Sequence, residues 1–131
     1  MGKSPTDWKL FALCANYNLV LSLDSLIAPL FATTATDMGV PLPIIGIVFV
    51  MYNVFGFALT PVVGHYLKVI TRRRCIIIGL LVLLASLCLF GCAQMFDVWT
   101  FVWLSALGRS LMGVGEAMVV TASYAVLASD Y

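Results

Sequence analysis

Charged residues are scarce in this chain. Of its 131 residues only 10% are Asp, Glu, Lys or Arg, whereas 63% are hydrophobic and the mean hydropathy is +1.08. A soluble domain of this size needs far more polar surface to cover its core. The scarcity of charge therefore excludes a soluble globular protein and indicates an integral membrane protein.

Residues that usually carry enzyme or metal chemistry are also few. The chain has one histidine, His65, and four cysteines. Cys88 and Cys92 share a helical face, but no His or further Cys stands near them in the sequence to complete a metal site. There is no nucleophile and base pair, no phosphate-binding loop after a strand, and no basic run with interleaved aromatic residues. We therefore expect no enzymatic activity, no cofactor, no bound metal and no nucleic-acid partner.

The chain contains four long apolar runs. Each is close to the roughly 20 residues that a helix needs to cross about 30 Å of hydrocarbon. The runs are continuous rather than alternating, which argues against the strands of a barrel. We predict an all-α membrane fold without a soluble domain. Its transmembrane helices lie at about residues 9–31, 44–67, 75–96 and 99–127, joined by short connections at 32–43, 68–74 and 94–97.

Basic residues outside the spans gather on one side of this four-span arrangement. They are Lys3, Lys9, Lys68, Arg72, Arg73 and Arg74. The opposite connections contain Asp37 and Asp97 and no Lys or Arg. Because short cytoplasmic loops hold an excess of Lys and Arg, we predict a multi-pass protein with both termini in the cytoplasm and residues 68–74 as a cytoplasmic loop.

Three charged residues nevertheless lie within the predicted spans: Asp24 in the first, and Arg109 and Glu116 in the fourth. A charge in mid-membrane costs roughly 2.5–3.5 kcal/mol on insertion scales, so such residues usually have a function. From the rise of a helix, Arg109 lies about 15 Å and Glu116 about 25 Å from the boundary at Trp99. Asp24 lies about 22 Å from Lys9 on the other side, which places it within reach of Arg109.

We interpret Asp24, Arg109 and Glu116 as a substrate and proton pathway. In this interpretation the carboxylates exchange protons or contact a polar substrate, while Arg109 adjusts how readily they hold a proton. The alternative is a buried ionic cluster that only fixes the register of the helices. Buried ion pairs are poor stabilisers, which favours the functional interpretation.

Small residues form stripes on two of the spans, at intervals of four. Such stripes allow a neighbouring helix to approach closely, so we predict roles in helix packing. Pro61 lies in the second span and can bend that helix, which gives gating as the functional alternative to packing. The stripe residues are Gly56, Thr60 and Gly64 in the second span, and Gly113 and Ala117 in the fourth.

Two segments resemble the major facilitator superfamily of transporters. The first is the end of the second span with the following loop, PVVGHYLKVITRRRCIIIG. It is similar to the family signature between helices two and three, with Gly64 and Arg72–Arg74 in matching positions. Lys68, Val69 and Thr71 stand where the family usually has Asp, Arg and Gly. In the family that Asp helps to latch the cytoplasmic side through charge contacts, so the resemblance does not extend to this latch.

The second segment, GRSLMGVGEA, is similar to the family's fourth-helix pattern through Arg109, Gly113 and Ala117. With Glu116 seven residues after the arginine, it looks most like the Spinster-like branch. Members of that branch export lysolipids or sphingoid lipids and use a helix-one Asp with a helix-four Arg and Glu in proton coupling. A relationship to vesicular-amine or drug/proton antiporters stays open.

The resemblance implies that residues 1–131 are the first part of an N-terminal six-helix lobe. It predicts a proton-coupled secondary transporter whose partners are the lipid bilayer, protons and a small-molecule or lipid substrate. Alternating access requires two bundles, so we expect a truncated chain that transports only when further helices, or a homo-oligomer, complete it. Two alternatives remain: a compact four-helix dimeric proton/drug antiporter that uses Asp24, and a tetraspan membrane protein without transport.

Overall fold

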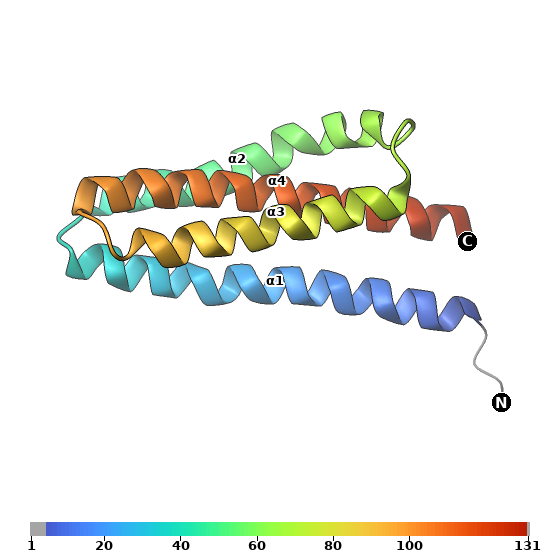
Figure 1. The fold of residues 1–131 in the computed structure, drawn as a ribbon, viewed down its shortest axis with the longest axis horizontal. Helices are drawn as coiled ribbons and strands as arrows, with labels where there is room; N and C mark the ends of the chain where they lie inside the picture. The colour runs from blue at the N-terminus through green and yellow to red at the C-terminus, as the bar shows by residue number, and fades with distance from the viewer. Residues whose placement is uncertain (1–4, 131) are drawn as a thin grey trace.

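The computed structural model describes residues 5–130, which form four long helices in an antiparallel bundle (Figure 1). The helices are α1 (Pro5–Asp37), α2 (Leu42–Tyr66), α3 (Arg72–Ala93) and α4 (Val98–Asp130). All four are long and apolar enough to cross a membrane. The predicted all-α membrane fold with four spans is confirmed. Lys3 and Tyr131, which we predicted to be cytoplasmic, lie outside the described residues.

The first helix is longer than predicted. We expected a connection from residue 32, but α1 continues to Asp37. Polar residues remain in the helix because their hydroxyls donate to carbonyls four residues earlier; they are Thr33, Thr34 and Thr36. The chain leaves the helix after Asp37 through Gly39, whose φ of 76° permits a left-handed turn. There the Gly39 amide donates to the Thr36 carbonyl and the Val40 amide to the Ala35 carbonyl.

The second connection is shorter than predicted. We expected residues 68–74 to form it, but α3 begins at Arg72, so Arg72–Arg74 are the first turn of a helix. Arg72 Nη1 donates to the Ser129 hydroxyl near the end of α4. Lys68 stays in the loop and is exposed. The α2–α3 connection lies at the same end of the bundle as both chain ends (Figure 1).

One phenylalanine from each helix meets at the opposite end of the bundle. The ring of Phe31 lies 5.7 Å from the rings of Phe49 and Phe101, and 5.9 Å from that of Phe90, between centroids. Phe31 and Phe101 are fully buried. We call these four residues the phenylalanine cluster. It fixes all four helices at the end where α1 turns into α2 and α3 turns into α4.

The third and fourth helices pack closely through glycines. A Cβ built on Gly79 would lie 3.0 Å from the Gly115 carbonyl oxygen, and one built on Gly115 would lie 2.9 Å from that of Gly79. Further along the same contact, the buried hydroxyl of Ser86 donates to the Gly108 carbonyl at 2.6 Å. The α3–α4 pair therefore forms a close-packed support behind the charged residues of α4.

Candidate functional site

Arg109 is buried at the contact between α4 and α1. Only 1% of its side chain is exposed, whereas Asp24 is 33% exposed. Arg109 Nη1 donates to Asp24 Oδ1 at 2.5 Å. The structure thus brings together these two residues, which lie 85 positions apart in the chain.

Aromatic rings of α2 surround the remainder of the guanidinium. The Arg109 Cζ atom lies 4.9 Å from the centre of the Phe49 ring and 5.8 Å from that of Tyr52. Both distances are within the range of cation–π attraction. Among residues 5–130, Arg109 Nε and Nη2 have no hydrogen-bond partner. The guanidinium is therefore held by one carboxylate and two rings. Its Nε and Nη2 groups can still donate hydrogen bonds to another acceptor.

Glu116 lies about two helical turns beyond Arg109 on α4 and has a different partner. Its Oε2 atom accepts a hydrogen bond from the Tyr52 hydroxyl. Within the described residues no ion pair joins Glu116 to Arg109; instead Tyr52 connects them, with its ring against the guanidinium and its hydroxyl on the carboxylate. We call Asp24, Arg109, Tyr52 and Glu116 the polar chain.

Sequence reasoning missed two members of this site, Phe49 and Tyr52. A signal for Tyr52 was present, because it places a hydroxyl in the middle of an apolar span, directly before Asn53. A buried hydroxyl in a membrane needs a partner, and a carboxylate at a similar depth was available. Phe49 gave no such signal, since one phenylalanine in an apolar span resembles any other.

A hollow of about 280 Å³ lies between α2 and α4 beside Glu116. We call it the α2–α4 hollow. Gly56 and Gly113 bring the two backbones together there, because a Cβ on Gly56 would lie 3.5 Å from the Gly113 carbonyl oxygen. Ala117 is buried and lines the same hollow. Thr60 lines the hollow as well, so four of the five predicted small residues are found between α2 and α4.

Gly64 is not at this contact. A Cβ built on it would meet no atom within 4 Å. Its neighbour Val63, only 8% exposed, faces the other helices instead, and one residue along a helix turns a side chain by about 100°. Within the described residues Gly64 therefore contacts no other helix, and the packing role that we predicted for it stays a prediction. The predicted loop residues Lys68 and Arg72–Arg74 lie at the end of the bundle and take no part in the polar chain.

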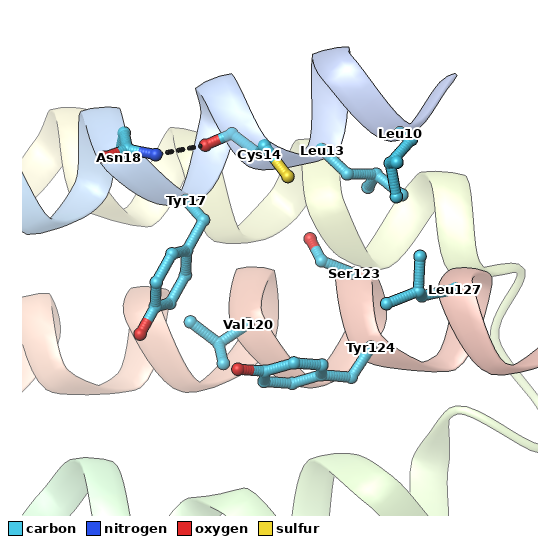
Figure 2. A pocket seen from close by; sticks show the side chains of 9 residues that line it. All are labelled: Leu10, Leu13, Cys14, Tyr17, Asn18, Val120, Ser123, Tyr124 and Leu127. Atoms are coloured by element: carbon cyan, nitrogen blue, oxygen red, sulfur yellow. Dashed lines mark hydrogen bonds between the residues drawn. The ribbon is translucent and has the colours of Figure 1, made fainter. Parts of the chain in front are cut away.

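A second depression, of about 190 Å³, separates the first half of α1 from the last third of α4. We call it the α1–α4 groove. Figure 2 shows Tyr17 of α1 directed toward α4, and Ser123 of α4 directed toward α1, with open space between the helices. Its lining is mainly apolar. The two depressions share Val120 of α4 in their lining, and of the two only the α2–α4 hollow contains a charged residue.

Four membrane-length helices around a buried ion pair define a multi-pass membrane protein of the transporter type. The family model of the Major Facilitator Superfamily matches residues 13–129, which is most of the chain, and the chain belongs to that superfamily. Neither a curated protein nor a solved structure matches it. The match is to the superfamily as a whole, so the Spinster-like branch stays a prediction.

Proposed function

We propose that the chain works as part of a proton-coupled secondary transporter, which moves a small organic or lipid-like solute by alternating access together with further helices. The observation that carries this proposal is the polar chain, which links three helices at mid-span. Membership of the superfamily supports transport. The two carboxylates, each held by a single described partner, support protons as the coupling ion.

The first carboxylate controls the contact between α1 and α4. When Asp24 is ionised, its charge attracts Arg109 across the 2.5 Å hydrogen bond. A proton on Asp24 removes that charge, so the attraction is largely lost and the guanidinium is left to its aromatic neighbours. Because the two residues belong to different helices, proton binding changes the force that holds α1 against α4.

The second carboxylate controls the contact between α2 and α4 in the same way. Ionised Glu116 accepts the hydrogen bond from Tyr52. A protonated Glu116 can itself donate, so the Tyr52 hydroxyl can turn and accept a hydrogen bond from it instead of donating one. Since the Tyr52 ring also contacts Arg109, a change at Glu116 reaches Arg109 without a direct bond between the two charges.

The position of α4 favours one lobe of a larger transporter over a dimer bridged by this helix. α4 contacts each of the other three helices. Most of the large side chains that it still exposes form a narrow row, Trp99, Trp103, Leu107 and Leu111; Val98 and Tyr124 are also exposed, and Tyr124 lines the α1–α4 groove. A dimer through α4 would have little more than this row available. Further helices can instead pack beside α1 and α2 and enclose the polar chain between two bundles, as alternating access requires.

The test is solute-driven proton movement in proteoliposomes that contain the native protein and a pH-sensitive dye. Organic cations, organic anions and lysolipids are added in turn across an imposed proton gradient. We expect one class to dissipate the gradient, and Asp24→Asn and Glu116→Gln to abolish that effect. Asp37→Asn, which removes an exposed carboxylate at the end of α1, serves as the control and should retain it. The isolated 131-residue chain is expected to be inactive in this assay.

Two results would contradict the proposal. One is a native protein that moves none of the three classes against protons. The other is transport that persists at the wild-type rate in both carboxylate variants, which would leave the polar chain with a structural role only.

A further inference from the structure

We infer that the α2–α4 hollow is a binding subsite for the positively charged nitrogen of an organic amine. This inference rests on the proposed function only in taking the chain to be a transporter, and it names the chemical class that the site accepts. The hollow combines one carboxylate, two aromatic rings and an amide from two helices: Glu116, Tyr52, Phe57 and Asn53.

The charge of the hollow is negative and has no counter-ion within it. Glu116 is the one charged residue among those of the described chain that line it. Arg109, the nearest cation along α4, is 1% exposed, does not line the hollow and is paired with Asp24. Tyr52 donates to Oε2 of Glu116, which leaves the lone pairs of Oε1 for a ligand. A carboxylate in a setting of low dielectric attracts a cation strongly.

The walls of the hollow suit a cation that carries apolar substituents. Phe57 lines the hollow although it is 86% exposed, and the Tyr52 hydroxyl contacts the carboxylate. The faces of aromatic rings attract ammonium groups, and carboxylates with rings are the usual recognition elements for alkylated amines. Gly56 and Gly113 have no side chains, so α2 and α4 approach closely there and neither position adds a side chain to the hollow. A volume of about 280 Å³ fits a compact ammonium group with its immediate substituents.

Other ligand classes fit this hollow poorly. An anion would face Glu116 without a neutralising partner, and an apolar molecule would strip water from the carboxylate without replacing its hydrogen bonds. A divalent metal needs several oxygen ligands, and the described residues contain no group of three metal-ligating side chains. A protonated amine is the class that satisfies the charge and the rings together.

Binding by the purified chain in lipid nanodiscs tests the inference without any need for transport. The probes are 2-phenylethylammonium and 2-phenylethanol, which have similar sizes and differ in charge; binding is measured by titration calorimetry. We expect the ammonium to bind at least about ten-fold more tightly than the alcohol, a conservative figure for one charge pair in a partly desolvated site. Glu116→Gln should abolish this preference, whereas Glu116→Asp, which keeps the charge, should retain most of it.

Two further variants separate charge from fold. Phe57→Leu keeps an apolar side chain but removes the ring, so we expect a loss of about two- to five-fold in ammonium affinity, the size of an exposed cation–π contact. Asp37→Asn removes a carboxylate outside the hollow and should change nothing. Equal binding of the two probes, or a preference that survives Glu116→Gln, would overturn the inference.

The outcome can be told apart from that of the proposed function. A native protein that transports amines without moving protons would remove the proton coupling and leave the subsite in place. A native protein that moves protons with an anionic solute, and whose α2–α4 hollow shows no preference for the ammonium probe, would remove the subsite alone.

Discussion

The two halves of α1 pack against the bundle in opposite ways. Between residues 7 and 19 no side chain of α1 is buried. The second half buries residues at spacings of four and seven, which all return to one helical face: Val20, Ile27, Phe31 and Ala35. This half ends in the phenylalanine cluster, whereas the first half faces α4 across the α1–α4 groove (Figure 2).

Asp24 lies at the boundary between these halves. A helix that is packed tightly at one end and loosely at the other can pivot about the tight end. A small displacement near the pivot then produces a larger displacement of the loose end. The ion pair between Asp24 and Arg109 occupies such a position. The comparison therefore teaches that packing along the tight half supplies stability, while the ion pair near the start of that half is the contact that one proton can alter.

Phe31→Ala should have the largest effect on stability. The change removes a fully buried ring that contacts three others, and we expect a loss of about 3 kcal/mol, as for other buried phenylalanines. The measurement is the free energy of unfolding from a titration with SDS in mixed micelles. Phe11→Ala, in the loose half and 66% exposed, is the control and should cost less than about 0.5 kcal/mol. Equal losses would show that the two halves do not differ in energy.

Asp24→Asn should have the next largest effect. It leaves the guanidinium of Arg109 buried without a counter-ion, which costs roughly 3–5 kcal/mol for fully buried pairs. Because Asp24 is 33% exposed, we expect about 2 kcal/mol, a figure below that range. A double variant, Asp24→Asn with Arg109→Met, should recover most of the lost stability, since no unpaired charge then remains. A double variant that is no more stable than Asp24→Asn alone would show that the ion pair is not the source of the loss.

The sequence predicted the helices and the depth of the charges well. Hydropathy reports directly on which residues can lie in a membrane, so the four spans were found. Depth follows from the rise per residue, which is why Asp24 and Arg109 could be matched before any contact was known. The helix ends were less predictable: Thr33, Thr34 and Thr36 look like loop residues, but their hydroxyls bond within the helix, and polarity alone does not reveal this.

The rotation of each helix about its own axis could not be predicted as well. After the three arginines of its first turn, α3 is apolar on all sides apart from Ser86, and such a sequence carries no information about which face meets a neighbour. Its glycine contact with α4 through Gly79 and Gly115 was therefore missed. On α2 the same uncertainty led us to include Gly64 in the packing stripe, and it hid the pairing of Tyr52 with Glu116.

The contact between α2 and α4 extends the comparison. At Gly113 the two backbones pack closely, whereas α1 and α4 are separated by the α1–α4 groove. A Cβ at Gly113 would overlap the carbonyl oxygen of Tyr52, whereas a Cβ at Gly56 would make an ordinary contact of 3.5 Å. We expect Gly113→Ala to cost about 1–2 kcal/mol through overpacking, and Gly56→Ala to be nearly neutral. The SDS titration measures both. A neutral Gly113→Ala would mean that α2 can move away from α4 without loss.

Tyr52→Phe should have the smallest effect on stability. It keeps the ring that contacts Arg109 and removes only the hydroxyl that donates to Glu116. Hydrogen bonds between membrane helices average about 0.6 kcal/mol, so we expect a loss of that order in the SDS titration. Tyr17→Phe is the matched control, because the Tyr17 side chain lines the loose α1–α4 groove, and it should cause no measurable loss.

In the proteoliposome assay, however, Tyr52→Phe should reduce solute-driven proton movement several-fold, since it breaks the connection between Glu116 and Arg109. A variant that is mildly destabilised but transports like the wild type would show that the polar chain is not needed to couple the two carboxylates.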